Sequence, residues 1–367
     1  MLRILQCVNI MDRAGLETML MNYYRKIDRT KIQFDFLTHR PDRGAYDDEI
    51  EAMGGRVYHA PRLYPQNYPS YYRYMKHFFA EHPEYRIIHS HIDAMSAFPL
   101  LAAKIGHIPY RIAHSHNSKL GKDLKLPIKF TALKCIPFLA NVYCACGEMA
   151  GQFMFPTQEF KIIPNAIDVE KFQYQQELRQ RVRSAQGWEN KLVIGHVGRF
   201  NYVKNQLFLL DAFKYILDSM DNCQLVLIGY GEDEQKIRDK IIALNLTDKV
   251  SVLINRSDVD ALYQAMDIFV MPSLFEGLPV VSVEAQANGL PCILSDKISR
   301  EAVLTDNAQM LSLECGPEGW ARAIIQADKT RNADAAQQLR KKGYDIQAEA
   351  EKLQRWYETL SVQDKGP

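Results

Sequence analysis

The sequence predicts an α/β protein with two doubly wound, Rossmann-like domains that face each other across a cleft. Three observations lead to this prediction. The chain has 367 residues, of which 47% are hydrophobic and 24% charged, so it can build two globular domains with separate cores. Short apolar runs alternate with longer amphipathic segments, as in parallel sheets covered by helices. The alternation pauses near residue 164 and then restarts, which gives domains at 1–167 and 168–344.

Each domain contains a series of short apolar runs that we expect to be strands. They are residues 2–10, 32–38, 56–59, 86–91, 111–116, 141–146 and 161–163 in the first domain, and 191–197, 224–228, 249–254, 268–272, 292–295 and 310–313 in the second. Helical spacing of apolar residues appears at 17–29, 96–105, 175–186, 205–219, 232–244, 258–265 and 280–288. A last helix, at 345–360, has no strand after it, so we expect it to pack back onto the first domain.

Charge and cysteine content narrow the class of protein. The net charge is +1, which gives no reason to expect a nucleic acid partner. Residues 1–167 carry +6 and the remainder −5, so the first domain is the better candidate to meet an anionic surface. The seven cysteines show no CxxC spacing, and we expect them to be reduced. The N-terminus has the pattern of a strand and not of a signal peptide, which predicts a cytoplasmic location.

Two glutamates, Glu276 and Glu284, stand eight positions apart around a Gly-Leu-Pro turn that opens a helix. The amides of Gly277 and Leu278 would lie at the helix N-terminus, which favours a phosphate group. Glu284 could accept hydrogen bonds from a ribose diol, and Glu276 from a sugar. The alternative is a capped surface helix with two solvated glutamates.

Two cations follow the first strand of the second domain. Arg199 comes directly after Gly198, and Lys204 lies five positions further on. A guanidinium and an ammonium at the carboxyl end of a strand can hold a diphosphate and stabilise it as it leaves. The alternative is a pair of solvated surface cations.

These motifs together resemble those of glycosyltransferase family 4. Residues 271–277 followed by Glu284 are similar to its E-x7-E signature, and residues 196–200 with Lys204 are similar to its Gly-Arg…Lys element. Residues 162–168 resemble its interdomain Pro-Asn-Gly segment, with Ala166 in place of Gly, and residues 228–231 resemble its Gly-x-Gly turn. The resemblance implies the GT-B fold, retention of anomeric configuration, and kinship with bacterial capsular and exopolysaccharide hexosyltransferases.

The resemblance also implies roles for individual residues. The expected donor-binding residues, for a UDP-sugar or another nucleoside diphosphate sugar, are Gly15, Arg199, Lys204, Gly229, Ile254, Glu276, Gly277, Leu278 and Glu284. The expected catalytic residues are His114, Arg199, Lys204 and Glu276. Gly15 follows the first strand, where relatives carry Gly-Gly and this chain has Ala14-Gly15, so an ordinary turn is the alternative there.

Histidines cluster at the ends of two strands in the first domain, as His89-Ser90-His91 and His114-Ser115-His116. His114 aligns with the family's histidine that contacts the donor sugar at the reaction centre. We expect His116 to point to the opposite side of its strand, and we assign His91, His116 and Asn117 as candidate acceptor contacts. A zinc site is the alternative, but no cysteine or carboxylate at ligand spacing completes it.

Residues 119–134 are basic and partly apolar, with five lysines among leucine, isoleucine and phenylalanine residues. Such a stretch could rest on anionic lipid at the inner face of the cell membrane, and family members often use lipid-linked saccharide acceptors. The alternative is an ordinary solvated helix face. No Asp-x-Asp follows a strand, so we expect no metal cofactor.

Other functions remain as alternatives. A Rossmann dehydrogenase would need G-x-G-x-x-G after its first strand, which neither domain has. A non-catalytic nucleotide-sugar-binding protein would keep the second-domain motifs but would not need His114. An inverting GT-B transferase, with a carboxylate or histidine base, is the nearest enzyme alternative.

Overall fold

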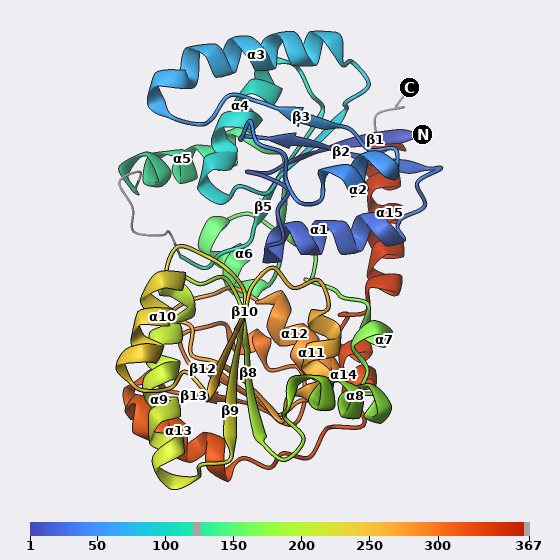
Figure 1. Cartoon of the computed structure of the whole chain (residues 1–367). Helices are drawn as coiled ribbons and strands as arrows, with labels where there is room; N and C mark the ends of the chain where they lie inside the picture. The colour runs from blue at the N-terminus through green and yellow to red at the C-terminus, as the bar shows by residue number, and fades with distance from the viewer. Residues whose placement is uncertain (120–125, 363–367) are drawn as a thin grey trace. The chain divides into compact units, whose positions relative to one another are not determined.

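The computed structural model of the chain describes residues 1–119 and 126–362. It divides into two compact units (Figure 1). Unit 1 consists of Met1–Ala166 and the C-terminal segment that begins at Ile346, and unit 2 consists of Ile167–Asp345. The chain therefore leaves unit 1, builds unit 2, and returns to unit 1 for its last helix.

Unit 1 is built on a seven-stranded parallel sheet with the order β3-β2-β1-β4-β5-β6-β7. The strands are β1 Leu2–Cys7, β2 Ile32–Thr38, β3 Val57–His59, β4 Ile87–Ser90, β5 Tyr110–Ser115, β6 Val142–Ala145 and β7 Lys161–Ile162. The helices are α1 Gly15–Lys26, α2 Asp47–Ala52, α3 Tyr68–Glu81, α4 Ala97–Ile105, α5 Leu126–Leu139, α6 Glu148–Met154 and α15 Ile346–Val362.

Alternation along the strands of unit 1 creates two different faces. Leu5, Ile88 and Ala113 point into a large apolar cluster with α3, α4 and α5. Their neighbours on the same strands point to the other face, which α1 and α15 cover (Figure 1). On that side Phe34 of β2 packs edge to face against Tyr357 of α15. The same face carries the polar side chains of the candidate site in unit 1.

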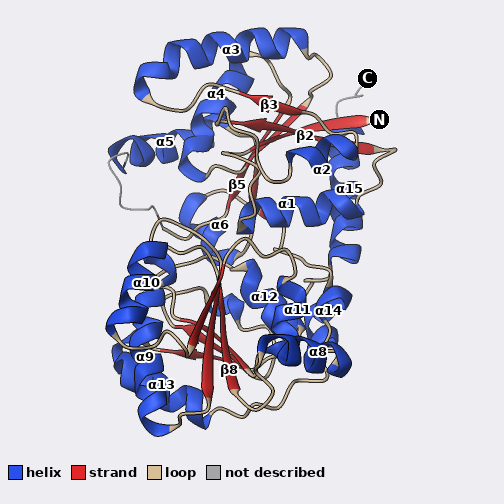
Figure 2. Ribbon diagram, in the orientation of Figure 1, coloured by secondary structure: helices blue, strands red, loops and turns tan. Residues whose placement is uncertain are grey.

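Unit 2 is built on a six-stranded parallel sheet with the order β10-β9-β8-β11-β12-β13. The strands are β8 Leu192–Val197, β9 Cys223–Ile228, β10 Val250–Leu253, β11 Ile268–Met271, β12 Cys292–Ser295 and β13 Ala308–Leu311. The helices are α7 Val169–Phe172, α8 Gln176–Gln186, α9 Gln206–Ser219, α10 Glu234–Ala243, α11 Val259–Ala265, α12 Val280–Ala287, α13 Gly316–Gln326 and α14 Ala335–Lys341. Figure 2 shows these helices on both sides of the sheet.

The two sheets have the same strand order over their first six strands, since each starts in the middle, grows to one edge, and then grows to the other. This is the Rossmann topology, in which ligands bind at the carboxyl ends of the central strands. In unit 1 those ends belong to β1, β4 and β5, and in unit 2 to β8, β9 and β11.

Every one of these strands was predicted from the sequence in the right order, with ends displaced by at most three residues and with β2 and β12 matched at both ends. The largest difference is at β1, which ends at Cys7 and not at residue 10. The last helix is α15, which lies beside α1 in unit 1. All seven cysteines are free, and five of them are buried. Among the described residues, no helix has the length and apolarity needed to span a membrane.

Candidate active site

In unit 2 two strand-end loops are tied together. The loop after β8 ends in a turn in which Asn201 Oδ1 accepts a hydrogen bond from the Lys204 amide at 3.1 Å. Asn205, with φ of 57°, donates from its side chain to the Pro272 carbonyl at 3.1 Å, and the Leu274 amide donates to the Val203 carbonyl at 2.8 Å. These bonds fix the loop that carries Lys204 against the loop that carries Glu276.

Lys204 and Glu276 form an ion pair between these loops. Lys204 Nζ lies 2.6 Å from Glu276 Oε1, which also accepts a hydrogen bond from Ser273 Oγ at 2.7 Å. The two charged side chains are only 14% and 16% exposed. The structure therefore brings two of the expected catalytic residues into contact, and it adds Ser273, which the sequence analysis did not identify.

Arg199 has a looser environment. Its side chain pairs with Glu232 at 3.0 Å, and both groups are more than half exposed. An exposed pair of this kind contributes at most about 1 kcal/mol, so an anionic ligand could readily replace Glu232. The Arg199 backbone is held more firmly, because Gln206 Nε2 donates to its carbonyl oxygen at 2.9 Å.

Gln206 is itself oriented by a buried histidine. His196 Nδ1 donates to the Val270 carbonyl at 2.9 Å, and His196 Nε2 accepts from Gln206 Nε2 at 3.2 Å. Burial lowers the pKa of His196 to about 4, so the imidazole is neutral and this pattern is stable. Gln206 carried no motif by which the sequence could have revealed it.

Gly229 and Gly231 allow the loop after β9 to approach the loop after β8. Gly229 has φ of 153°, and a Cβ on it would collide with the Gly198 carbonyl oxygen. A Cβ on Gly231 would collide with the Phe200 backbone in the same way. Packing alone thus requires the Gly-x-Gly turn. Ile254, just after β10, is 42% exposed.

Glu284 lies on α12, which begins at Val280 directly after Pro279, so Gly277 and Leu278 lie just before the helix. Tyr263 of α11 donates its hydroxyl to Glu284 Oε2 at 3.1 Å. Burial raises the pKa of Glu284 to about 7, so both its protonated and ionised forms are populated near neutral pH. Tyr263 was not foreseen, because its role depends on the packing of α11 against α12.

In unit 1 four histidines form a compact array at the ends of β4 and β5. His89 stacks on His91 with 4.2 Å between ring centroids, and His114 stacks on His116 at 4.1 Å. Across the strands, His89 Nε2 lies 3.0 Å from His114 Nδ1, and His91 Nδ1 lies 3.0 Å from His116 Nε2. The expectation that His116 points away from His114 was wrong, because residues two apart on a strand share a face.

Burial lowers the pKa of all four histidines, that of His116 to about 3, so the array is neutral. His91 also contacts Gln6 Oε1 through Nε2 at 2.8 Å, so protein groups occupy both of its ring nitrogens. Its expected role as an acceptor contact therefore has no ring nitrogen to use. Within the described residues, His114 Nε2 is buried and has no hydrogen-bond partner.

Asp93 supports the end of this array. It has φ of 46°, a conformation uncommon outside glycine, and its carboxylate accepts from the His116 amide at 2.9 Å and from the Asn117 side chain at 2.5 Å. Asp93 thus positions two of the candidate acceptor residues, which the sequence analysis did not predict. Gly15 begins α1, and a Cβ on it would meet no atom within 4 Å. Packing therefore does not require a glycine at Gly15.

Ligand atoms of His89, His91 and His114 lie within 4.8 Å of one another, close enough for a shared zinc ion to be considered. A metal must lie in the plane of each imidazole that binds it. The rings of His89 and His91 are stacked with 27° between their planes, so their lone pairs do not converge on a near point. The geometry fits two stacked hydrogen-bonded pairs and not a metal site.

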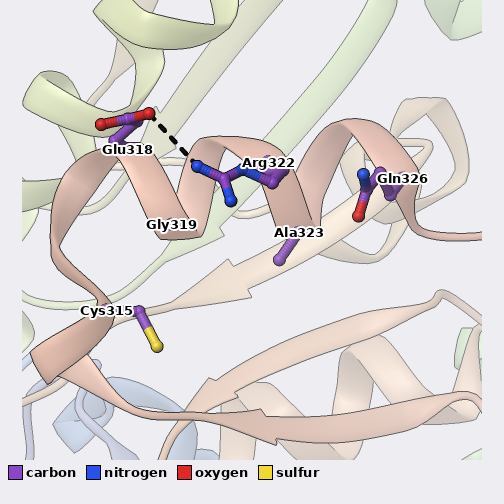
Figure 3. Close-up of a pocket in the computed structure, with 6 residues that line it drawn as sticks. All are labelled: Cys315, Glu318, Gly319, Arg322, Ala323 and Gln326. Carbon is purple, nitrogen blue, oxygen red and sulfur yellow. Dashed lines mark hydrogen bonds and ion pairs between the residues drawn. The ribbon is translucent and has the colours of Figure 1, made fainter.

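A surface hollow of about 370 Å³ lies on α13, lined by Cys315, Glu318, Gly319, Arg322, Ala323 and Gln326 (Figure 3). Glu318 and Arg322 pair along the helix at 3.2 Å. These lining residues all lie within 315–326, outside the strand-end loops that carry the sequence motifs of unit 2. We assign the hollow no part in the site.

Comparisons with known proteins agree with this architecture. Residues 13–171 match the family model described as Glycosyltransferase Family 4, and residues 179–346 match Glycosyl transferases group 1. The chain is 36% identical to EpsF of Bacillus subtilis (strain 168), which carries a glycosyltransferase name, over 99% of this chain and 98% of that protein.

A second relative is the UDP-Gal:alpha-D-GlcNAc-diphosphoundecaprenol alpha-1,3-galactosyltransferase of Escherichia coli, 29% identical over 58% of each chain. Among solved structures, Anabaena HepE in complex with UDP-glucose superposes with a TM-score of 0.82 at 20% identity, over 99% of this chain and all of that one. This likeness shows the fold. The chain therefore belongs to glycosyltransferase family 4, and it is a nucleotide-sugar-dependent glycosyltransferase with the GT-B fold.

Proposed function

We propose that this enzyme transfers a hexose from a nucleoside diphosphate sugar, most simply a UDP-sugar, to a lipid-linked saccharide, with retention of anomeric configuration. The observation that carries the proposal is the Lys204–Glu276 ion pair at the carboxyl edge of the unit 2 sheet. It sets a cation for phosphate beside a carboxylate for sugar hydroxyls. The UDP and UDP-glucose complexes of HepE, a protein of the same fold, support a uridine nucleotide donor.

The donor would bind at this edge by replacing the present ion-pair partners of two cationic side chains. Lys204 and Arg199 would turn from Glu276 and Glu232 to the diphosphate, which frees the Glu276 carboxylate to accept from sugar hydroxyls. The amides of Gly277 and Leu278, before α12, would add donors to phosphate oxygen. Glu284 would accept from the ribose hydroxyls.

The transfer step would need no protein nucleophile. The acceptor hydroxyl attacks the anomeric carbon on the face that the diphosphate leaves, and the leaving phosphate oxygen takes the hydroxyl proton. Arg199 and Lys204 would stabilise the charge that develops on the diphosphate, so we propose that no metal ion is required. His114 of unit 1 would contribute to the reaction centre.

The acceptor side is proposed from unit 1. The Escherichia coli relative is named for a diphosphoundecaprenol-linked acceptor, which favours a lipid-linked saccharide in surface polysaccharide synthesis. Helix α5 exposes Leu126, Phe130 and Phe138, and Lys134 Nζ lies 4.5 Å from the Phe130 ring centroid. Apolar side chains beside a lysine suit peripheral contact with anionic lipid at the inner membrane face. Lys122 and Lys125 lie outside the described residues.

The test is to screen UDP-glucose, UDP-galactose and UDP-N-acetylglucosamine by thermal shift, and then to run the best donor with a diphospholipid-linked monosaccharide. Nuclear magnetic resonance of the product gives its anomeric configuration. An α-linked product from an α-linked donor is expected. A β-linked product would favour an inverting GT-B transferase, and binding without turnover with any acceptor would favour a nucleotide-sugar-binding protein.

A further inference from the structure

A chain of buried hydrogen bonds connects the C-terminal helix to His114. Tyr357 of α15 is almost fully buried, and its hydroxyl lies 2.6 Å from His89 Nδ1. His89 Nε2 in turn lies 3.0 Å from His114 Nδ1. Gln6 of β1 begins the chain, with its Nε2 donating to the Tyr357 hydroxyl at 3.4 Å. The chain ends at His114 Nε2, which is buried and has no partner among the residues described.

The direction of each bond follows from the first one. Gln6 Oε1 faces His91 Nε2 at 2.8 Å, so the Gln6 amide nitrogen faces Tyr357 and donates to it. The Tyr357 oxygen is then an acceptor, and its single proton goes to His89 Nδ1. The short 2.6 Å distance is typical of an O–H donor and short for an N–H donor.

The same logic continues through the two imidazoles. Both rings are neutral, so each carries one proton. His89 accepts at Nδ1 and must hold its proton on Nε2, from which it donates to His114 Nδ1. His114 therefore holds its own proton on Nε2.

We infer that Tyr357 is a positioning residue that fixes, through His89, the tautomer in which His114 presents an N–H group at Nε2. The inference rests on the proposed role of His114 at the reaction centre. An unsatisfied buried donor is unfavourable, so an oxygen of the sugar or the acceptor would satisfy it. A nitrogen that already holds its proton cannot remove one from an acceptor hydroxyl. The tautomer thus makes His114 a hydrogen-bond donor and opposes the form of the inverting alternative in which His114 is the base.

The tautomer is directly measurable in the full-length protein. Long-range ¹H–¹⁵N spectra of histidine-labelled enzyme distinguish protonated from unprotonated ring nitrogens, and H114A identifies the His114 signals. We expect protons on Nε2 of both His89 and His114 in the native enzyme. Y357F should redistribute the His114 proton between its two nitrogens.

Y24F is the matched control. Tyr24 is a fully buried tyrosine of the same unit, packed on Phe34 as Tyr357 is, and its hydroxyl donates to Gln33 Oε1 at 2.7 Å. It has no bond to the histidine array among those described. Y24F should leave the His114 tautomer unchanged.

The turnover rate is the second measurement. We expect Y357F to lower kcat about tenfold with little change in donor Kd, and Y24F to change neither. A native His114 with its proton on Nδ1, an unchanged tautomer in Y357F, or an equal kcat loss in Y24F would overturn the inference. So would one equivalent of Zn²⁺ that shifts the His89 and His91 signals. If Y357F does not fold, the native spectrum alone decides the tautomer. Full turnover in H114A would instead refute the proposed role of His114.

Discussion

The two units have the same strand order but opposite chemistry at the carboxyl edges of their sheets. In unit 2 the edge carries charges, with Lys204 paired to Glu276 and Arg199 paired to Glu232. In unit 1 the corresponding edge carries the neutral, buried imidazoles of His89 and His114. A charged edge suits a diphosphate, and a neutral one suits sugar hydroxyls. Topology thus decides where a ligand can bind, while the loops decide which chemistry it meets.

The largest expected effect is on the charged edge. We predict that R199A and E284A each lower kcat/KM by at least roughly a hundredfold, because each removes a charged contact to the donor. Arg199 would lose its phosphate and Glu284 its ribose hydroxyls. R238A is the control, since Arg238 forms a partly exposed ion pair with Glu234 on α10. Folded R199A and E284A enzymes with near-normal kcat/KM would remove unit 2 from the proposed mechanism.

At the neutral edge of unit 1 we expect a loss in kcat and not in donor affinity. H114A should lower kcat about tenfold or more while it changes donor Kd little, because His114 would contact the reacting sugar and not the nucleotide. Steady-state kinetics and donor titration measure the two effects separately. H77A, which removes an exposed histidine from α3, is the control. Equal losses in kcat and affinity would make His114 a simple binding residue.

The two edges should also differ in their response to pH. The pKa of Glu284 is raised to about 7, so its ionised fraction grows between pH 6 and pH 8. An ionised carboxylate accepts ribose hydroxyls more strongly, so UDP-sugar affinity should rise up to about tenfold over this range. E284Q should abolish the rise. The pKa of His196 is about 4 and that of His116 about 3, so neither titrates there. A flat affinity profile in the native enzyme would contradict the role of Glu284.

A smaller effect is expected for lipid binding by unit 1. The F130S and F138S variants each remove an exposed phenyl ring from α5, and we predict several-fold weaker sedimentation with anionic vesicles. Added salt should weaken binding further, because it screens the basic residues. Y215S removes an exposed ring from α9 of unit 2 and should have no effect. Binding that ignores lipid charge and salt, or the absence of any binding, would point to a soluble acceptor and leave α5 as an ordinary exposed helix.

For metal removal we predict no effect. If Arg199 and Lys204 neutralise the leaving diphosphate, turnover in EDTA should equal turnover without it. The assay needs only the native enzyme and its donor. Loss of activity in EDTA that manganese restores would show that the charged edge depends on a metal ion.

The sequence revealed strands such as β9 and β11 well because their runs are almost continuously apolar, as strands buried on both faces are. The motifs located Glu276 and Glu284 correctly before and within α12. The pairing of Glu276 with Lys204 could not be predicted, since it depends on how two loops fold against each other.

The details of the histidine array were also beyond the sequence. Tyr357 and His89 are 268 positions apart, and only the return of α15 to unit 1 brings them together. Gln206 and Tyr263 have no motif of their own, because they act through packed neighbours. The orientation of His116, by contrast, could have been predicted from the sequence. Residues two apart on a strand share a face, and this rule was applied wrongly.

The return of the chain from unit 2 has a consequence for how the protein is made. The 166 residues that leave the ribosome first lack α15, and with it the hydroxyl that orders the histidines, until synthesis is almost complete. Closing so long a loop would be entropically costly. In folded unit 2, however, Ile167 and Asp345 pair as neighbours, and the Ile167 amide bonds to the Tyr344 carbonyl at 3.0 Å. Folding of unit 2 should therefore bring residue 346, where α15 begins, next to residue 167, where unit 1 ends. A mutation that only slows the folding of unit 2 is then expected to delay the assembly of the histidine array.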